Sequence, residues 1–103
     1  MSISSNTWGT RLKEARLATK MSQKTLGITT GLDPSVASTR INRYELGIHR
    51  PDYKMEARLA ESLQIPIGFL YEPNDKLAYM LLHISRLPEE EMRLLIEFIS
   101  TLK

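Results

Sequence analysis

The sequence predicts an all-α protein: a five-helix domain followed by two additional C-terminal helices. Apolar residues recur at helical spacing along most of the chain, and no segment alternates apolar and polar residues as a half-buried strand would. Prolines and glycines stand between these segments, where helices start and stop. The length of 103 residues suits one compact domain with a short appendage.

Local signals set the expected helix boundaries. The first helix covers Thr10 to Ala18, and Ser22 is a good N-cap for a short second helix. Gly31 follows the second helix where a left-handed residue would end it. The pair Asp33-Pro34 is then a strong start signal, so a third helix is expected over residues 33–46.

The remaining helices begin at prolines or turns. A fourth helix opens at Pro51 and a short fifth one at Pro66. A turn at residues 72–75 is the one plausible internal boundary. We therefore expect a domain of residues 1–73 and a C-terminal helical appendage of residues 74–103, whose two helices are separated by a proline.

Composition and charge narrow the function. The chain has no cysteine, so it cannot form a disulfide or a thiolate metal site, and no apolar run is long enough to span a membrane. The N-terminus lacks a signal-peptide core, so a cytoplasmic protein is expected. His49 and His83 lie on different elements and no catalytic motif occurs, so we expect no enzyme activity, no cofactor and no metal.

The charge is divided unevenly between the two halves. Residues 1–54 hold nine Lys/Arg against four Asp/Glu, whereas residues 55–103 hold five against eight. A basic half joined to an acidic half favours a polyanion-binding face on one side only. Three glutamates at 89–91 fit the first turn of the last helix, where the helix dipole favours acids, rather than a metal site.

The most informative stretch surrounds the second and third helices. Gly27 would let the third helix pack closely, and Gly31 would make the tight turn between the two. Ile41 and Tyr44 would anchor the third helix in the core and leave its opposite face free. That face is rich in hydrogen-bonding groups and nearly free of acids, as contact with base edges requires.

In this order the residues resemble the helix-turn-helix of the Xre family of phage repressors and Cro proteins. The matching residues are Arg16, Ser22, Gln23, Leu26, Gly27, Gly31, Ile41, Tyr44, Glu45, Gly47, Pro51, Leu59 and Ala60. The resemblance covers roughly residues 9–71. It implies a sequence-specific DNA-binding transcriptional regulator whose third helix reads the major groove of double-stranded DNA. Repression is favoured because the chain has no evident activation surface. It also implies a homodimer on an inverted repeat.

The chain departs from the family pattern at one place. Four more residues than usual separate Gly31 from Ile41, and four residues are about one helical turn. We expect them to lengthen the third helix at its N-terminus by Asp33 to Val36. The alternative is an extended loop before a helix of normal length.

The free face and the resemblance together assign roles to side chains. Base contacts are expected from Ser35, Ser38, Thr39, Arg40, Asn42 and Arg43. Phosphate contacts are expected from Gln23, Lys24, His49, Arg50 and Lys54. The alternative for both groups is a solvated basic face. The resemblance further pairs Arg16 with Glu45 as a partly buried ion pair between the first and third helices.

The two C-terminal helices carry apolar stripes that they cannot bury alone. We expect a homodimer interface made by Leu81, Ile84, Met92, Leu95, Ile96, Ile99 and Leu102. The alternative is that this appendage only caps its own monomer. Three other functions stay open. The protein could be an antitoxin that neutralises a toxin and controls its own promoter. It could also activate transcription through contact with polymerase, or be a pure protein-interaction module.

Overall fold

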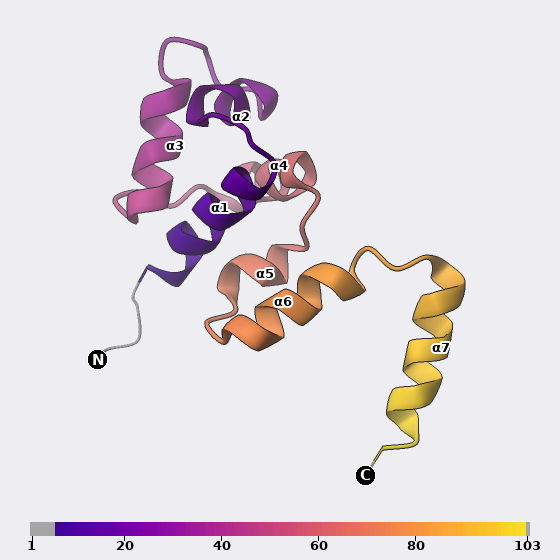
Figure 1. The fold of residues 1–103 in the computed structure, drawn as a ribbon. Coiled ribbons are helices and arrows are strands. Elements are labelled where there is room, and N and C mark those ends of the chain that lie inside the picture. The colour runs from indigo at the N-terminus through magenta and orange to yellow at the C-terminus, as the bar shows by residue number, and fades with distance from the viewer. Residues whose placement is uncertain (1–5, 103) are drawn as a thin grey trace.

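The computed structural model describes residues 6–102, and every regular element in that range is an α-helix (Figure 1). The helices are α1 (Thr7–Ala18), α2 (Gln23–Thr29), α3 (Ala37–Leu46), α4 (Tyr53–Leu63), α5 (Ile67–Tyr71), α6 (Asp75–Ile84) and α7 (Glu89–Ser100). The predicted all-α class with two additional C-terminal helices is confirmed. No helix within this range has the length and apolar character that a membrane crossing requires.

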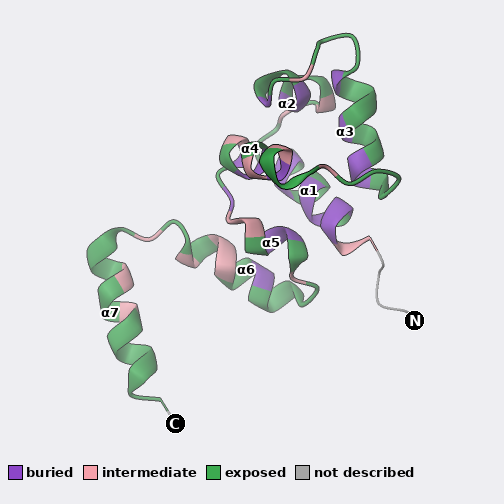
Figure 2. Ribbon diagram, turned by 180° about the vertical axis from the view of Figure 1, so that it is seen from behind, coloured by how far each residue is buried: buried purple, intermediate pink, exposed green. Residues whose placement is uncertain are grey.

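One hydrophobic core joins the first five helices. The large side chains that are fully buried are Leu12, Leu26, Ile41, Leu59, Leu63 and Leu70. Each of the helices α1 to α5 contributes at least one of them. Helix α6 packs against α5 and buries only Ala78, and α7 extends away from the rest without burying any residue (Figure 2).

The third helix is shorter than predicted. It begins at Ala37, so the expected helix over residues 33–46 is wrong, and a loop precedes a helix of normal length. The Val36 amide donates to the Asp33 carbonyl at 3.0 Å, which closes a turn, but Val36 has a φ of −119°, far from helical values near −63°. The Asp33-Pro34 signal therefore starts a single turn that stops before α3.

Side-chain hydrogen bonds stabilise this turn locally. The Asp33 carboxylate accepts from the Ser35 hydroxyl at 2.6 Å and from the Ser35 amide at 2.8 Å. The hydroxyl bond first, and then the amide bond, lower the pKa of the Asp33 carboxyl. The carboxylate thus stays ionised at neutral pH and keeps its role as an acceptor.

The place where α3 begins is fixed by its packing on α2. A Cβ atom added to Gly27 would lie 2.6 Å from the Ala37 Cβ, closer than real Cβ contacts come. Ala37 is also fully buried. The four additional residues therefore enter the loop, because inserting them into the contact would displace Ala37 from Gly27. Gly47, with a φ of 78°, ends α3 in the left-handed conformation.

Replacing Gly27 with alanine should destabilise the fold. The added methyl group meets Ala37, and overpacking of this kind costs about 1–3 kcal/mol. Gly68→Ala is the matched control, because nothing lies within 4 Å of its added Cβ and alanine favours a helix by up to about 1 kcal/mol. Urea unfolding of both variants measures the difference; equal midpoints would show that the two helices do not touch as described.

Candidate nucleic-acid interface

Helix α3 presents a polar face to solvent. Its other side is anchored by Ala37, Ile41 and Tyr44, which are all buried. The exposed side chains of the helix are Ser38, Thr39, Arg40, Asn42, Arg43 and Leu46. The structure therefore places five of the six expected base-contacting residues on one exposed helix surface, which contains no acid.

Ser35 is the one predicted base-contacting residue that does not lie on α3. It lies in the turn before α3, and both its amide and its hydroxyl donate to Asp33. Its assignment to the helix face depended on the lengthened helix. Ser35 now belongs to the loop that leads into α3.

Asn42 is oriented by a hydrogen-bonded chain that starts in the protein interior. The Gln23 amide nitrogen donates to the Glu45 carboxylate at 3.0 Å and to the Asn42 side-chain oxygen at 3.1 Å. Because a carboxylate only accepts, the NH2 end of Gln23 must face it. Both amide hydrogens of Gln23 are thereby engaged, and the NH2 group of Asn42 is left to point away from Gln23.

The same contacts change the role expected of Gln23. A phosphate contact needs a donor, but both donors of its side-chain amide already serve Glu45 and Asn42. Gln23 connects α2 to α3 in this arrangement. The phosphate contact predicted for Gln23 would therefore require it to give up one of these two hydrogen bonds.

Arg16 and Glu45 form a buried ion pair. The Nε atom of Arg16 lies 2.6 Å from one carboxylate oxygen of Glu45, and its Nη2 lies 3.2 Å from the other. The two side chains are only 10% and 3% exposed. The remaining guanidinium nitrogen donates to the Met21 carbonyl at 2.9 Å. This two-pronged contact ties α1 to the C-terminal part of α3.

A basic cleft of about 330 Å³ lies beside the α3 face. It is lined by Arg40, Arg43, Tyr44, His49 and Arg50. Four of these side chains can carry positive charge, and no acid lines the cleft. The arrangement concentrates positively charged side chains beside the exposed face of α3.

Arg50 is held in place by two aromatic rings. Its guanidinium carbon lies 4.9 Å from the ring centre of Trp8 and 5.4 Å from that of Tyr71. The Tyr71 hydroxyl accepts from Arg50 at 3.0 Å and donates to the Glu56 carboxylate, which also accepts from the Trp8 indole at 2.6 Å. The bond to Glu56 is the main reason that the pKa of Tyr71 is raised.

Two of these residues, Glu56 and Tyr71, were missed by sequence reasoning. Glu56 is a buried acid on the side of α4 that also carries Leu59 and Ala60, and such an acid in an apolar stripe was the available signal.

Lys24 and Lys54 are exposed, as their predicted phosphate contacts require. Among the described residues, no group of His, Asp and Glu side chains could hold a metal ion.

The expected dimer residues of the appendage are exposed to different degrees. Leu81, Ile84, Met92 and Leu95 are half-buried, whereas Ile96, Ile99 and Leu102 are more than half exposed. Leu94 and Phe98 are also at least half exposed. The apolar surface of α7 is thus wider than the single predicted stripe.

The fold is that of a known transcriptional regulator. The crystal structure of the transcriptional regulator BswR matches this fold with a TM-score of 0.88 and 44% sequence identity. The match covers 91% of this chain and 93% of that one. The chain therefore belongs to the same family as the transcriptional regulator BswR. No family model matches the chain, and a search of curated proteins finds no match.

Removing one partner of the buried ion pair should be costly. Glu45→Leu leaves the Arg16 guanidinium buried without its carboxylate, and such changes lower the free energy of unfolding by about 3–5 kcal/mol. The double variant Arg16→Met/Glu45→Leu should recover most of that loss, because no charge then remains buried. Denaturant unfolding of the single and double variants gives the coupling between the two positions.

The exposed pair Arg93–Glu97 serves as a control for this cycle. Its side chains are 54% and 63% exposed, so Glu97→Gln should cost less than about 1 kcal/mol. If the double variant at positions 16 and 45 loses as much stability as the single one, the cost comes from packing and not from an unpaired charge.

Proposed function

We propose that this protein is a sequence-specific DNA-binding regulator, a repressor in its simplest mode, that reads the major groove with α3. The observation that carries the proposal is the acid-free polar face of α3, which projects from a helix whose opposite side is buried. An α-helix fits the major groove, where each base pair presents a distinct pattern of donors and acceptors. Repression is the simplest mode because blocking a promoter requires only occupancy.

The geometry of α3 supports different roles for its side chains. Arg43 is the best candidate for a bidentate contact with guanine, with Ser38 and Thr39 beside it. Asn42 offers its NH2 group to base acceptors, since its oxygen accepts from Gln23. Arg40 and Arg43 both line the basic cleft, so Arg40 stays a candidate for a base contact, while His49 and the ring-held Arg50 at its edge are candidates for phosphate contacts.

A homodimer would let two copies of α3 read two half-sites. One recognition helix contacts only a few base pairs, whereas two helices about 34 Å apart contact half-sites about one turn of DNA apart. We propose an inverted repeat as the target, with residues of the appendage, residues 74–103, forming the dimer. The exposed apolar side chains of α7 support this assignment.

Selection of bound duplexes from a random DNA pool tests the function directly. The expected product is an inverted repeat whose half-site centres are about 10 base pairs apart or a whole number of turns further. Equal recovery of all sequences at physiological ionic strength would refute sequence-specific binding. Recovery of a single unrepeated half-site would retain DNA binding and reject the dimeric mode.

Arg43→Ala should weaken binding to the selected site by about 1–3 kcal/mol and relax the base preference at one position in each half-site. The reason is the loss of a bidentate contact with one base. Arg93→Ala on α7 removes an exposed arginine far from α3 and should leave affinity unchanged (Figure 1). An equal loss on every sequence would show instead that Arg43 contacts a phosphate.

Lys54→Ala should weaken binding to all sequences alike and flatten the salt dependence. Each phosphate contact contributes about −0.9 to the slope of log affinity against log salt concentration. Lys76→Ala, an exposed lysine on α6, is the matched control. Titrations at several salt concentrations measure the slope, and an unchanged slope for Lys54→Ala would remove that residue from the phosphate contacts.

A further inference from the structure

Arg50 differs from the other two arginines of the basic cleft in how firmly it is held. Within residues 6–102, neither Arg40 nor Arg43 lies over an aromatic ring, whereas the guanidinium group of Arg50 lies over two. One of its N–H groups also donates to the Tyr71 hydroxyl at 3.0 Å. Arg50 is therefore a fixed cation beside two arginines that can adapt to what they contact.

The Tyr71 hydroxyl is itself oriented by a buried acid. Glu56 is 5% exposed, and its carboxylate accepts from Trp8 and from Tyr71. Because a hydroxyl carries one hydrogen, the bond to Glu56 leaves the oxygen lone pairs of Tyr71 for Arg50. The same bond raises the pKa of Tyr71, so the hydroxyl stays protonated at neutral pH and keeps this direction.

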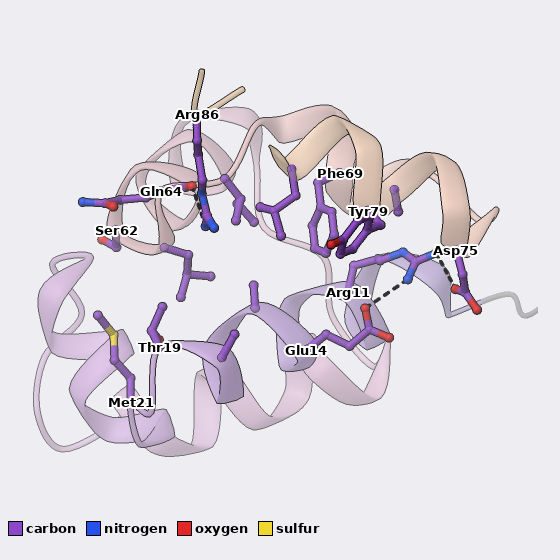
Figure 3. A pocket seen from close by; sticks show the side chains of 16 residues that line it. Arg11, Glu14, Thr19, Met21, Ser62, Gln64, Phe69, Asp75, Tyr79 and Arg86 are labelled. Atoms are coloured by element: carbon purple, nitrogen blue, oxygen red, sulfur yellow. Dashed lines mark hydrogen bonds and ion pairs between the residues drawn. The ribbon is translucent and has the colours of Figure 1, made fainter. Parts of the chain in front are cut away.

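The end of α5 that carries Tyr71 is tied to α1. Arg11 on α1 donates to the Glu72 carbonyl at 2.9 Å and forms an ion pair with Asp75 at 2.9 Å (Figure 3). Trp8 lies on the same helix, α1. The two rings that contact Arg50 are thus fixed relative to each other, although Tyr71 is half exposed.

Most donors of Arg50 remain available for a ligand. A guanidinium group has five N–H donors in a planar fork, and Tyr71 engages one of them. The Glu56 carboxylate lies 3.8 Å from Nη2, which is beyond hydrogen-bond distance, and the Arg50 side chain is half exposed. The fork can therefore offer two parallel donors to a phosphate, the geometry in which arginine binds phosphate best.

We propose that Tyr71, oriented by Glu56, positions Arg50 to hold one DNA phosphate in a two-pronged contact. The inference deepens the proposed function and rests on it. A phosphate is the same at every base pair, and phosphate contacts set the register of a protein on DNA. A cation fixed in advance suits this task, because it avoids the loss of side-chain freedom that a mobile arginine suffers on binding.

Tyr71→Phe tests the positioning role. The variant keeps the ring beside Arg50 but removes the hydroxyl, so affinity should fall about two- to tenfold on every duplex, the range of one hydrogen bond. The salt slope should not change, because the charge of Arg50 remains. Tyr79→Phe on α6, whose ring contacts His83, is the matched control and should leave affinity unchanged. Fluorescence anisotropy titrations of selected and scrambled duplexes measure both quantities.

A double-mutant cycle separates positioning from folding. Arg50→Ala should weaken binding to all sequences and reduce the salt slope by about 0.9. Because Tyr71 acts through Arg50, adding Tyr71→Phe to Arg50→Ala should cause no further loss of affinity. A further loss by the same factor would show that Tyr71 supports the fold or contacts DNA by another route, which overturns the inference.

Arg50→Lys separates the charge from its positioning. Lysine keeps the positive charge but lacks the planar fork that lies over the rings, so the salt slope should be retained while affinity falls. In the free protein, NMR relaxation of the Arg50 Nε–H group should show a rigid side chain that becomes mobile in Tyr71→Phe. Unchanged affinity of Arg50→Lys, or an Arg50 side chain that is already mobile in the unmodified protein, overturns the proposal.

The outcomes distinguish this inference from the proposed function. If selection recovers a preferred duplex and Arg50→Ala binds it as tightly as the unmodified protein, the inference fails and the sequence-specific regulator stands. If selection recovers no preferred duplex but Arg50→Ala and Tyr71→Phe weaken binding as described, the sequence-specific function fails while the phosphate contact stands. A protein that binds no duplex overturns both.

Discussion

The carboxylate of Glu45 joins three helices, and the orientation of the exposed α3 face depends on it. One of its oxygens accepts from Arg16 on α1 at 2.6 Å, and the other accepts from Gln23 on α2 at 3.0 Å. A rotation of α3 would break both contacts and leave charges buried without partners. The free energy lost in this way is much larger than the net stability that the ion pair contributes. Glu45 therefore contributes mainly to a single orientation of α3. Through Gln23, that orientation extends to the exposed side chain of Asn42.

Most of the fold could be predicted because its signals are local. A cap such as Ser22 and a helix-ending glycine such as Gly47 act within one turn of their own position. The start of α3 could not be predicted in this way. A cap followed by proline begins either a helix or a single turn, and the choice is made by Gly27 and Ala37, which are ten residues apart and meet only in the folded protein. The contact, and not the local signal, determines where the four additional residues go.

The same distinction explains what was predicted of the site. Helical periodicity identified which side of α3 is anchored, because Ile41 and Tyr44 recur at core spacing. Hydrogen-bond partners do not follow from periodicity. The engagement of both Gln23 amide hydrogens depends on a carboxylate 22 residues away, and the position of Arg50 depends on Tyr71, 21 residues away. The prediction treated the side chains of Gln23 and Arg50 as free donors, because their hydrogen-bond partners lie far away in the sequence.

The two ends of the molecule present opposite chemistry, and this opposition is consistent with two separate tasks. The α3 side carries an arginine-rich cleft without acids, which suits a polyanion, whereas α7 carries four glutamates and a broad apolar surface, which DNA would not cover. In the proposed dimer the α7 contact sets how far apart the two α3 helices lie without itself contacting DNA. Dimerisation and DNA binding are then linked equilibria, so a change on α7 alters operator occupancy only through the concentration of dimer. A change on α3 alters operator occupancy at any dimer concentration. The dependence of occupancy on protein concentration therefore distinguishes the role of α3 from that of α7.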